Sequence, residues 1–320
     1  MPEALVTGAT GFLGTRLCRR LDDRGWSVTA TRRDGSDVSA LADVDVEWVY
    51  ADVLDPEAVS EAVDGHDRVF HLAGVGLAAA DAETVRRVNE EGTRTVVDAC
   101  ERAGVERLVF TSTAGTRRRD DGTPADETDR AEPIGAYQES KAAAEAVVDR
   151  AAERGLDAVT VHPTSVFGPG DEEFTARLLT LALDPKMVAY LPGGASFVSL
   201  DDAVDGILAA MEHGSAGEHY VLGGENLTYG EALGVIAEHG DGRGPSVRVP
   251  PAAIHAAGPV VGAVNELAGL RLFPFDAEMA RLATRRLFYS SAKAERDLGY
   301  AARPLSAHVE EAIEWYREKA

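Results

Sequence analysis

Cysteine is scarce in this chain of 320 residues, which contains only Cys18 and Cys100. Both lie in segments whose apolar spacing predicts amphipathic helices, so we expect buried, reduced thiols rather than a disulfide. No cluster of His, Cys and Asp has the spacing of metal ligands, and we therefore predict no metal site. These absences exclude a disulfide-stapled scaffold.

The sequence also lacks a long hydrophobic run. The longest uncharged stretch covers residues 249–265, and Pro250, Pro251 and Pro259 interrupt it. It is too short and too broken to span a bilayer, so we interpret it as part of a buried or lid-forming helix pair over Pro251–Leu270. Because Met1-Pro2-Glu3 begins no signal peptide, we expect a cytoplasmic protein that has no membrane partner.

Positive charge is scarce as well, with 32 Lys and Arg against 54 Asp and Glu and a net charge of −22. Such a charge repels nucleic acid and anionic membranes, so we expect neither as a partner. Only four of the basic residues are lysines. Molar salt shortens the Debye length to about 3 Å and screens self-repulsion, so the composition predicts a halophilic protein, with an ordinary acidic bacterial protein as the alternative.

Short apolar segments alternate with amphipathic ones through the first half of the chain. Strands are predicted at Ala4–Thr7, Ser27–Thr31, Glu47–Ala51, Arg68–Leu72, Arg107–Ser112 and Ala158–His162, and helices at Leu13–Arg24, Ala82–Ala103 and Tyr137–Arg154. Gly25, Gly104 and Gly155 follow these helices, where left-handed C-caps are expected. Such alternation requires right-handed crossovers, so the fold class is α/β, with a Rossmann-type doubly wound parallel sheet covered on both faces.

A glycine-rich segment, Thr7-Gly8-Ala9-Thr10-Gly11-Phe12-Leu13-Gly14, follows the first predicted strand. Glycines at this spacing let the backbone approach a pyrophosphate, and the helix that follows offers free N–H groups and a partial positive charge. The alternative is a glycine-rich turn with no ligand, because such spacing also arises by chance. Its position after the first strand favours a dinucleotide site.

Arg32 and Arg33 stand at the tip of the second predicted strand, where NAD-binding proteins carry a carboxylate for the ribose 2′-hydroxyl. Two guanidinium groups there suit bidentate binding of a 2′-phosphate. The alternative is a pair of solvated loop arginines. In a chain so poor in basic residues, this pair favours NADP(H) as the cofactor, with NAD as the alternative.

The pattern of elements changes after Pro163, and Gly168-Pro169-Gly170 marks a break. Mixed elements follow, with helices predicted at 202–212, 228–238 and 304–319 and a strand at 219–222. We therefore expect an NADP-binding Rossmann domain over residues 1–167, joined by about 195–214. Residues 168–320 would mainly form a smaller α/β substrate domain over the carboxyl edge of the sheet, where open α/β sheets bind ligands.

Tyr137 and Lys141 are four residues apart in a predicted helix and therefore share one face. A nearby cation stabilises phenolate, so Lys141 should lower the pKa of Tyr137 toward neutrality. Such a tyrosine gives a proton to a carbonyl oxygen or takes one from an alcohol. The alternative is a surface Tyr and a Lys paired with a neighbouring Glu. Thr111-Ser112-Thr113 adds hydroxyls at the carboxyl end of the fifth strand.

The order of these motifs resembles that of the short-chain dehydrogenase/reductase superfamily. The Thr-Gly-x-x-Gly-x-x-Gly spacing at Thr7–Gly14 and the chain length look like its extended branch, the NAD-dependent epimerase/dehydratase proteins. The resemblance covers essentially the whole chain and includes His71–Gly74, Val88–Thr93 and Val161–Pro169. Gly217–Thr228 is similar to proteins named hopanoid-associated sugar epimerases, a group that itself resembles dihydroflavonol reductases.

The resemblance implies a role for each matched catalytic residue. Tyr137 would be the general acid/base, and Lys141 would lower its pKa and hold the nicotinamide ribose. Thr113 would hydrogen-bond the reacting oxygen, where Ser is commoner in the superfamily. Ser112 stands next to it, and we favour Thr113 while leaving the choice between the two hydroxyls open. Asn89 would anchor a helix rather than catalyse.

The resemblance also implies the contacts with the cofactor. Asp52 and Val53 match a pair that contacts adenine, although an Asp at this place can simply end a strand. Together with Arg32, Arg33, Tyr137 and Lys141, the implied cofactor-binding residues are Gly8, Thr10, Gly11, Phe12, Leu13, Gly14, Asp52, Val53, Leu72, Ala73, Gly74, Thr111, Ser112, Pro163, Thr164 and Val166.

The implied activity is NADPH-dependent reduction of a ketone or aldehyde, or the reverse oxidation of an alcohol. The alternative is a nucleotide-sugar epimerase or dehydratase with bound NAD, but such members usually carry Asn where this chain has Ser165. A second alternative is a non-catalytic NADP(H)-binding sensor or assembly subunit, which typically loses the Tyr or the Lys. Helices Ala82–Ala103 and Tyr137–Arg154 would form a homodimer through a four-helix interface, and the substrate would be a small molecule.

Overall fold

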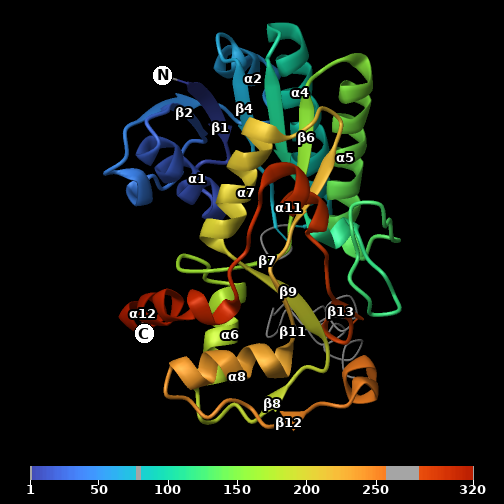
Figure 1. Cartoon of the computed structure of the whole chain (residues 1–320). Coiled ribbons are helices and arrows are strands. Elements are labelled where there is room, and N and C mark those ends of the chain that lie inside the picture. The colour runs from blue at the N-terminus through green and yellow to red at the C-terminus, as the bar shows by residue number, and fades with distance from the viewer. Residues whose placement is uncertain (1, 77–80, 257–280, 320) are drawn as a thin grey trace.

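The protein is built on a seven-stranded parallel sheet with the strand order β10-β6-β5-β4-β1-β2-β3 (Figure 1). The structure, a computed structural model, describes residues 2–76, 81–256 and 281–319. The strands are β1 (Glu3–Thr7), β2 (Ser27–Arg32), β3 (Val46–Tyr50), β4 (Arg68–His71), β5 (Arg107–Thr111), β6 (Ala158–Pro163) and β10 (His219–Leu222). Every neighbouring pair is parallel, which confirms the predicted fold class.

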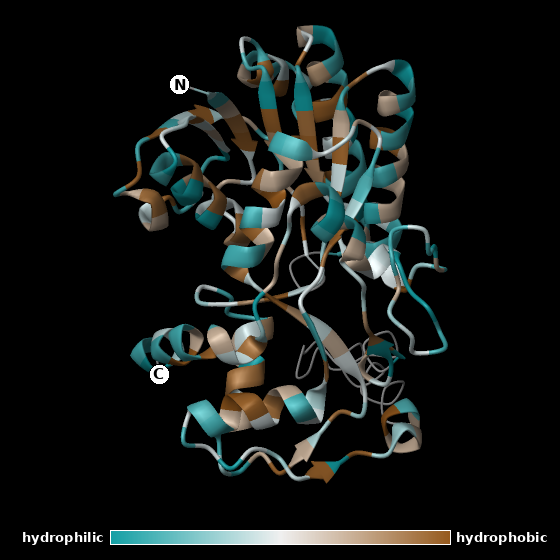
Figure 2. Cartoon of the chain, in the orientation of Figure 1, coloured by the Kyte–Doolittle hydropathy of each residue, from teal (hydrophilic) through white to brown (hydrophobic). Residues whose placement is uncertain are grey.

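Helices cover both faces of this sheet, and each face has its own apolar core. On one face lie α1 (Phe12–Asp23), α7 (Leu200–His213) and α11 (Ala292–Leu298). On the other lie α2 (Pro56–Val63), α4 (Gly92–Ala103) and α5 (Gly135–Arg154). Cys18 is buried in the first core and Cys100 in the second, and both are free thiols as predicted. The strands are predominantly apolar between helices whose outer surfaces are polar (Figure 2).

The predicted helix Ala82–Ala103 is interrupted by a π-helical segment. It divides into α3 (Ala82–Arg86), the segment η2 (Arg87–Glu91) and α4. Asn89 in this segment is fully buried, and its amide bonds the backbone of Val75 and the hydroxyl of Ser140. One extra residue in the turn lets this side chain point inward, which apolar periodicity does not reveal.

The rest of the chain forms a second, smaller sheet. It contains β7 (Ser165–Phe167), β9 (Gly194–Ser199), β11 (Glu225–Thr228) and β13 (Arg286–Leu287), while β8 (Ala189–Tyr190) pairs with β12 (Val247–Arg248). The helices α6 (Phe174–Leu183), α8 (Tyr229–His239) and α12 (Val309–Lys319) share a third apolar core with β9. Short 3-10 turns lie at η1 (Ser39–Leu41), η3 (Ala114–Thr116) and η4 (Leu305–Ala307). The small sheet and the helices α6, α8 and α12 lie beyond the carboxyl ends of the large sheet (Figure 1), whereas Leu41 of η1 belongs to the first core beside α1.

The chain crosses between the two sheets more than once. After β9 it returns as α7 and β10, which complete the large sheet before β11 rejoins the small one. The division at residues 167 and 168 therefore stays a prediction, and the strand 219–222 belongs to the large sheet. Of the predicted helix pair Pro251–Leu270, residues 251–256 are helical, and 257–270 lie outside the described residues.

The ends of several helices are set by local signals in the sequence. Gly25, Gly104 and Gly155 all have positive φ after helices, which confirms the predicted C-caps. The helix predicted at 202–212 begins at Leu200, and its N-cap is Ser199, whose hydroxyl accepts from the Asp202 N–H. Asp201 and Asp202 lie in the first turn of this helix, where their carboxylates accept hydrogen bonds from Arg16 and Arg303. None of the helices in the described ranges has the length and apolarity needed to cross a bilayer.

Candidate active site

The glycine turn joins β1 to α1, and its glycines lie in close contact with neighbouring backbone atoms. Gly8 has φ of +74°, and a Cβ on it would lie 2.6 Å from the backbone nitrogen of Ala73. A Cβ on Gly14 would lie 2.1 Å from the carbonyl oxygen of Gly8. Gly11, the N-cap of α1, gives no side-chain hydrogen bond, so the first N–H groups of the helix have no side-chain cap. This is the geometry that a helix N-terminus needs to accept a phosphate.

A cavity of about 330 Å³ opens beside this turn, at the carboxyl ends of the strands. Ten of the predicted cofactor residues line it: Gly8, Thr10, Gly11, Arg32, Arg33, Asp52, Val53, Leu72, Ala73 and Gly74. Thr31, Ser36, Ala51, Val75 and Val88 also line it and were not predicted. Ser36 lies in the short polar loop after the second strand, three residues from Arg33. This closeness in sequence was the signal that could have predicted Ser36 as a cavity residue.

The other predicted contacts lie outside this cavity. Phe12, Leu13 and Gly14 form the first turn of α1, and Thr111, Ser112, Tyr137 and Lys141 lie where β5 ends and α5 begins. Pro163 ends β6, Val166 belongs to β7, and Thr164 connects them, its N–H donating to the Leu222 carbonyl at 3.2 Å. The hydroxyl of Thr111 is buried without a hydrogen-bond partner among the described residues. This orphaned hydroxyl suits a sugar hydroxyl of a bound dinucleotide, so the residues present fit the predicted cofactor.

Asp52 has a local structural role beside the cavity. One of its carboxylate oxygens accepts from the N–H of Leu54 at 2.9 Å, which supports the turn into α2. Val53 is buried against Gly92, where a Cβ would come within 2.6 Å of the valine methyl. The strand-ending interpretation of Asp52 therefore has a direct structural basis, and the residue still lines the cavity.

Tyr137 and Lys141 lie one turn apart near the start of α5. The ammonium of Lys141 is buried, donates to the carbonyl oxygen of Thr111 at 3.0 Å, and lies 5.2 Å from the centre of the Phe110 ring. Burial lowers the pKa of Lys141 to about 8, although Glu145 acts to raise it. The ammonium of Lys141 is therefore hydrogen-bonded to the end of β5 rather than to the phenol of Tyr137.

The pKa of Tyr137 is raised, because burial disfavours the phenolate, while a hydrogen bond with the Thr113 hydroxyl opposes that shift. The prediction that Lys141 lowers this pKa is wrong for the chain by itself, since the ammonium is not among the causes that shift it. The phenol is accordingly held in its protonated form at neutral pH. Protonated phenol is the form that can give a proton to a carbonyl oxygen.

Ser112 and Thr113 face different environments. The hydroxyl of Ser112 is buried and donates to the carboxylate of Glu145 in a short hydrogen bond. The hydroxyl of Thr113 lies beside the phenol of Tyr137 and accepts from the Gly115 N–H at 3.2 Å. A reacting oxygen beside Tyr137 would therefore meet Thr113, whereas Ser112 is occupied behind it.

A buried polar cluster, which sequence reasoning missed, lies behind this strand end. Glu145 accepts from Thr116 at 2.7 Å and from the guanidinium of Arg117 at 2.8 Å, and both charged side chains are 1% exposed. Burial raises the pKa of Glu145, but neighbouring His162 and Arg117 outweigh it and the net shift is downward. The sequence did contain a signal for this cluster. Polar residues stand at every fourth position of the predicted helix, at Tyr137, Lys141, Glu145 and Asp149, and therefore share one face.

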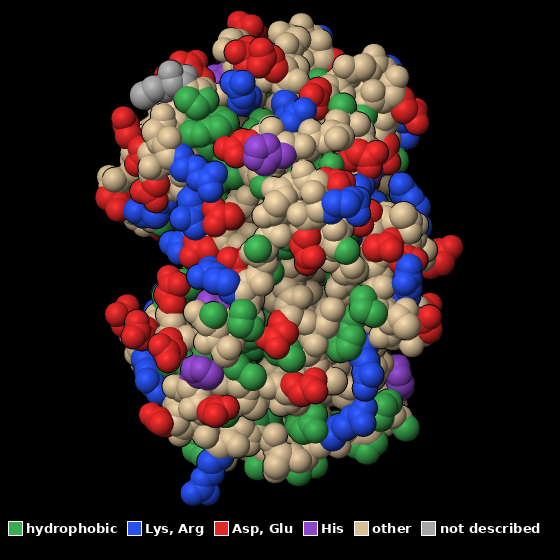
Figure 3. Space-filling model, in the orientation of Figure 1, with side chains coloured by type: hydrophobic (Ala, Val, Ile, Leu, Met, Phe, Trp, Pro, Cys, Tyr) green, Lys and Arg blue, Asp and Glu red, His purple; other side chains and the backbone are tan. Residues whose placement is uncertain are grey.

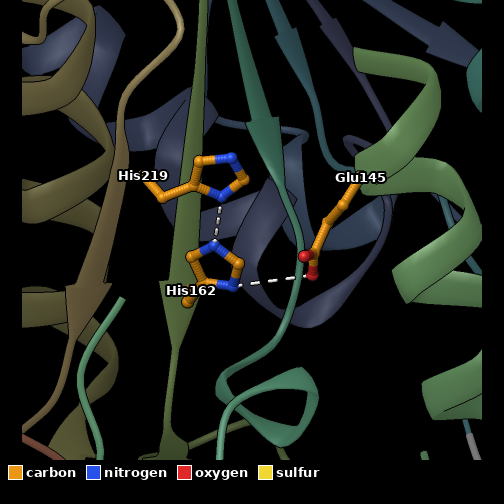
Figure 4. Close-up of side chains that lie close together, drawn as sticks. All are labelled: Glu145, His162 and His219. Atoms are coloured by element: carbon orange, nitrogen blue, oxygen red, sulfur yellow. Dashed lines mark hydrogen bonds and ion pairs between the residues drawn. The ribbon is translucent and has the colours of Figure 1, made fainter. Parts of the chain in front are cut away.

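Two histidines extend the cluster toward the edge of the sheet. Nε2 of His162 is 2.9 Å from Nδ1 of His219, and Nε2 of His219 is 2.8 Å from Asp149. Glu145, His162 and His219 bring three potential metal-ligand atoms within 4.8 Å of one another. However, Glu145 and His219 face opposite nitrogens of the His162 ring (Figure 4), and Arg117 contacts both of them. These contacts do not fit a metal site, because the guanidinium already supplies the positive charge.

The glycine turn, the cavity and the Tyr137–Lys141 pair, of which the lysine is buried, are together typical of a dinucleotide-dependent enzyme on a doubly wound sheet. The model of the NAD dependent epimerase/dehydratase family matches residues 4–223. The chain therefore belongs to this family of extended short-chain dehydrogenase/reductases, whose members are NAD(P)-dependent oxidoreductases, epimerases and dehydratases. That membership confirms the resemblance noted in the sequence.

Individual proteins similar to this chain include reductases. Sterol demethylase protein B of Methylococcus capsulatus is 32% identical to this chain, and the match covers 98% of this chain and 98% of that protein. A 2-alkyl-3-oxoalkanoate reductase of Stenotrophomonas maltophilia is also 32% identical, over 93% of this chain and 94% of the relative. The crystal structure of gox2253 superimposes with a TM-score of 0.88 and 34% identity, covering 100% of this chain and 99% of that one. The similarity therefore extends over both sheets.

Proposed function

We propose that this protein is an NADPH-dependent carbonyl reductase, acting on a ketone or aldehyde and, in reverse, on the corresponding alcohol. The observation that carries the proposal is the contact between the Tyr137 phenol and the Thr113 hydroxyl, one helical turn from the buried ammonium of Lys141. Two hydroxyl donors side by side can hold one carbonyl oxygen. The name of the Stenotrophomonas maltophilia relative, an oxoalkanoate reductase, agrees with this reaction class.

In the proposed reaction, Thr113 and Tyr137 both donate hydrogen bonds to the substrate oxygen and polarise the carbonyl bond. When bound, the reduced nicotinamide supplies a hydride to the carbonyl carbon. The phenol of Tyr137 gives its proton to the oxygen as negative charge develops there, so the product is a neutral alcohol. The raised pKa of Tyr137 keeps this proton available at neutral pH. The phenolate left on Tyr137 then takes up a proton from solvent, which restores the acid for the next turnover.

The cofactor in this proposal is NADP(H), held along the cavity by the residues implied in the sequence. Arg32 and Arg33 line one end of the cavity together with Ser36, and no carboxylate ends β2. Guanidinium and hydroxyl groups favour a 2′-phosphate over a free 2′-hydroxyl. The unpartnered hydroxyl of Thr111 and the ammonium of Lys141 would hold the nicotinamide ribose.

A nucleotide-sugar epimerase or dehydratase with permanently bound NAD is the second candidate, because the matching family contains such enzymes. Ser165, in β7, stands where those members usually carry Asn for the diphosphate. Mass spectrometry of the protein purified in high salt separates the two functions. Tightly retained NAD would support the epimerase and contradict the reductase, whereas exchangeable NADPH would support the reductase.

Substitution of Tyr137 tests the mechanism. With a carbonyl compound that the native protein reduces in a panel of ketones and aldehydes, Tyr137→Phe should lower turnover by about 10²- to 10⁴-fold. Tyr316→Phe is the matched control, since Tyr316 hydrogen-bonds Thr180 in the small-sheet layer. Full turnover by Tyr137→Phe would exclude the mechanism. Thr113→Val should lower turnover more than Ser112→Ala, and the reverse order would assign the catalytic hydroxyl to Ser112.

A homodimer and a cytoplasmic location complete the proposal. The helical segment from Ala82 to Ala103 and α5 would pair with their copies in a four-helix interface, as the resemblance implies. Light scattering in high salt measures the mass directly, and a mass of one chain would exclude the dimer.

A further inference from the structure

Tyr50 is an aromatic residue with no packing role in the core. It is the last residue of β3, the edge strand of the large sheet, and the residue is 56% exposed. It pairs in register with Arg32, the last residue of β2, and the next residue, Ala51, lines the cofactor cavity.

The ring of Tyr50 supports the side chain of Arg32. The guanidinium carbon lies 4.2 Å from the centre of the Tyr50 ring and 6.0 Å from that of Trp48, two residues earlier in β3. A terminal nitrogen of Arg32 also donates to the Tyr50 hydroxyl. Residues two apart in a strand share a face, so Trp48 and Tyr50 form one aromatic platform under the cation. Cation–π contact of this kind restricts where the guanidinium can lie.

Arg32 and Arg33 have no carboxylate partner among the described residues, although acidic residues outnumber basic ones in the chain. The Nε atom of Arg32 is buried and has no hydrogen-bond partner there. Ser36 lines the same end of the cavity, and its hydroxyl accepts from the Arg33 N–H at 3.2 Å. Arg32, Arg33 and Ser36 thus bring guanidinium and hydroxyl groups to one end of the cavity, and no carboxylate within the described ranges neutralises the two arginines there.

We propose that Tyr50 is a specificity-determining residue for the phosphorylated cofactor, because its ring holds the Arg32 guanidinium at the place where the adenosine 2′-phosphate binds. The inference rests on the proposed use of NADP(H) and adds a residue outside the implied cofactor contacts. Tyr50 acts through Arg32 and is a positioning residue. Its effect is therefore confined to the phosphate and absent from the rest of the nucleotide.

Calorimetric titration with 2′,5′-ADP and with 5′-AMP tests this role, since the two probes differ in the 2′-phosphate and neither reacts. Tyr50→Ala should bind 2′,5′-ADP about two- to fivefold more weakly, the loss expected for one exposed cation–π contact. Its affinity for 5′-AMP should not change. Tyr50→Phe keeps the ring and should stay within twofold of the native affinity for 2′,5′-ADP.

A matched control removes the same kind of contact elsewhere. Trp315 in α12 lies under the ammonium of Lys319 at 5.2 Å, and Trp315→Ala should leave both affinities unchanged. Equal weakening of both probes by Tyr50→Ala, or no weakening of either, would overturn the role of Tyr50. If the native protein binds 5′-AMP as tightly as 2′,5′-ADP, the proposed NADP(H) preference itself fails, and the inference fails with it. The melting temperature of each variant reports separately on folding.

Discussion

At the scale of single residues, the buried pair Glu145–Arg117 is the feature with the largest energetic consequence. The two opposite charges are 2.8 Å apart and each side chain is 1% exposed. Burial of either charge is tolerated only because the other one is present. Removing one partner leaves the other charge buried without compensation, which costs far more than the pair contributes. The pair also joins α5, which carries Tyr137 and Lys141, to the loop that follows β5.

Glu145→Gln should therefore lower the free energy of unfolding by about 3–5 kcal/mol. Glu139→Gln on the same helix removes an exposed ion pair with Arg86 and should cost no more than about 1 kcal/mol. Urea unfolding of the three proteins at one salt concentration measures both effects. Equal losses for the two variants would show that burial of the Glu145–Arg117 pair carries no special weight.

His71 gives the protein a pH dependence. Its ring is fully buried between the hydroxyls of Thr7 at 2.7 Å and Thr93 at 3.0 Å. Burial, with a smaller contribution from Lys141, lowers its pKa to about 3. The unfolded chain, with a histidine pKa of about 6.5, takes up a proton that the folded chain refuses, so this contribution is complete above pH 6.5 and declines as pH falls toward 3.

At pH 5 this single group should lower the free energy of unfolding by about 2 kcal/mol relative to pH 8. The decline in unfolding free energy between pH 8 and pH 5 should be smaller by that amount in His71→Gln. Denaturant titrations at several pH values measure the two slopes. An unchanged slope in the variant would mean that His71 does not titrate in this way.

At the scale of elements, a ladder of ion pairs joins α1 to α7. Arg16 and Arg20 of α1 and its C-cap residue Arg24 are four residues apart and face Asp201 and Asp205 of α7. Asp201 accepts two bonds from Arg16, at 2.6 and 2.9 Å, and one from Arg20. The ladder fixes the glycine-turn helix against the helix that the chain adds after β9.

Asp201→Asn should lower the free energy of unfolding by about 1.5–3 kcal/mol, the range for hydrogen bonds to charged groups. Asp205→Asn should cost less than about 1 kcal/mol, because that carboxylate is 43% exposed. Thermal or urea unfolding compares the two. A larger loss at Asp205 would contradict the assignment of Asp201 as the centre of the ladder.

At the scale of the whole molecule, the feature that governs the response of stability to salt is the net charge. Acidic side chains are distributed over the displayed face with basic ones between them, and no broad basic patch gathers there (Figure 3). The net charge of −22 repels itself in the compact state, and salt screens that repulsion.

Raising potassium chloride from about 0.1 M to about 2 M should therefore raise the melting temperature, since the Debye length falls from about 10 Å to below about 3 Å. Differential scanning fluorimetry across this range measures the change. Potassium chloride rather than sulfate is used because sulfate also strengthens apolar burial. A melting temperature that falls with salt would mean that the ion-pair ladder outweighs the self-repulsion.

The sequence by itself determined the large parallel sheet, the glycine turn and the Tyr137–Lys141 row, because each depends on local spacing along the chain. Strand and helix periods, glycines at positive φ and residues four apart on a helix need no knowledge of distant partners. It also supplied the two arginines at the end of β2. These features were enough to indicate the family before any contact was known.

Only the tertiary structure decided which groups meet. It joined Arg32 to Tyr50 through the register of two parallel strands, and it brought Arg117 to Glu145 and His162 to His219 across β5, β6 and β10. It also showed that burial raises the pKa of Tyr137, whereas the spacing of Lys141 predicted the opposite. The physical reason is that desolvation and pairing depend on everything packed around a group, and most of those neighbours come from distant parts of the chain.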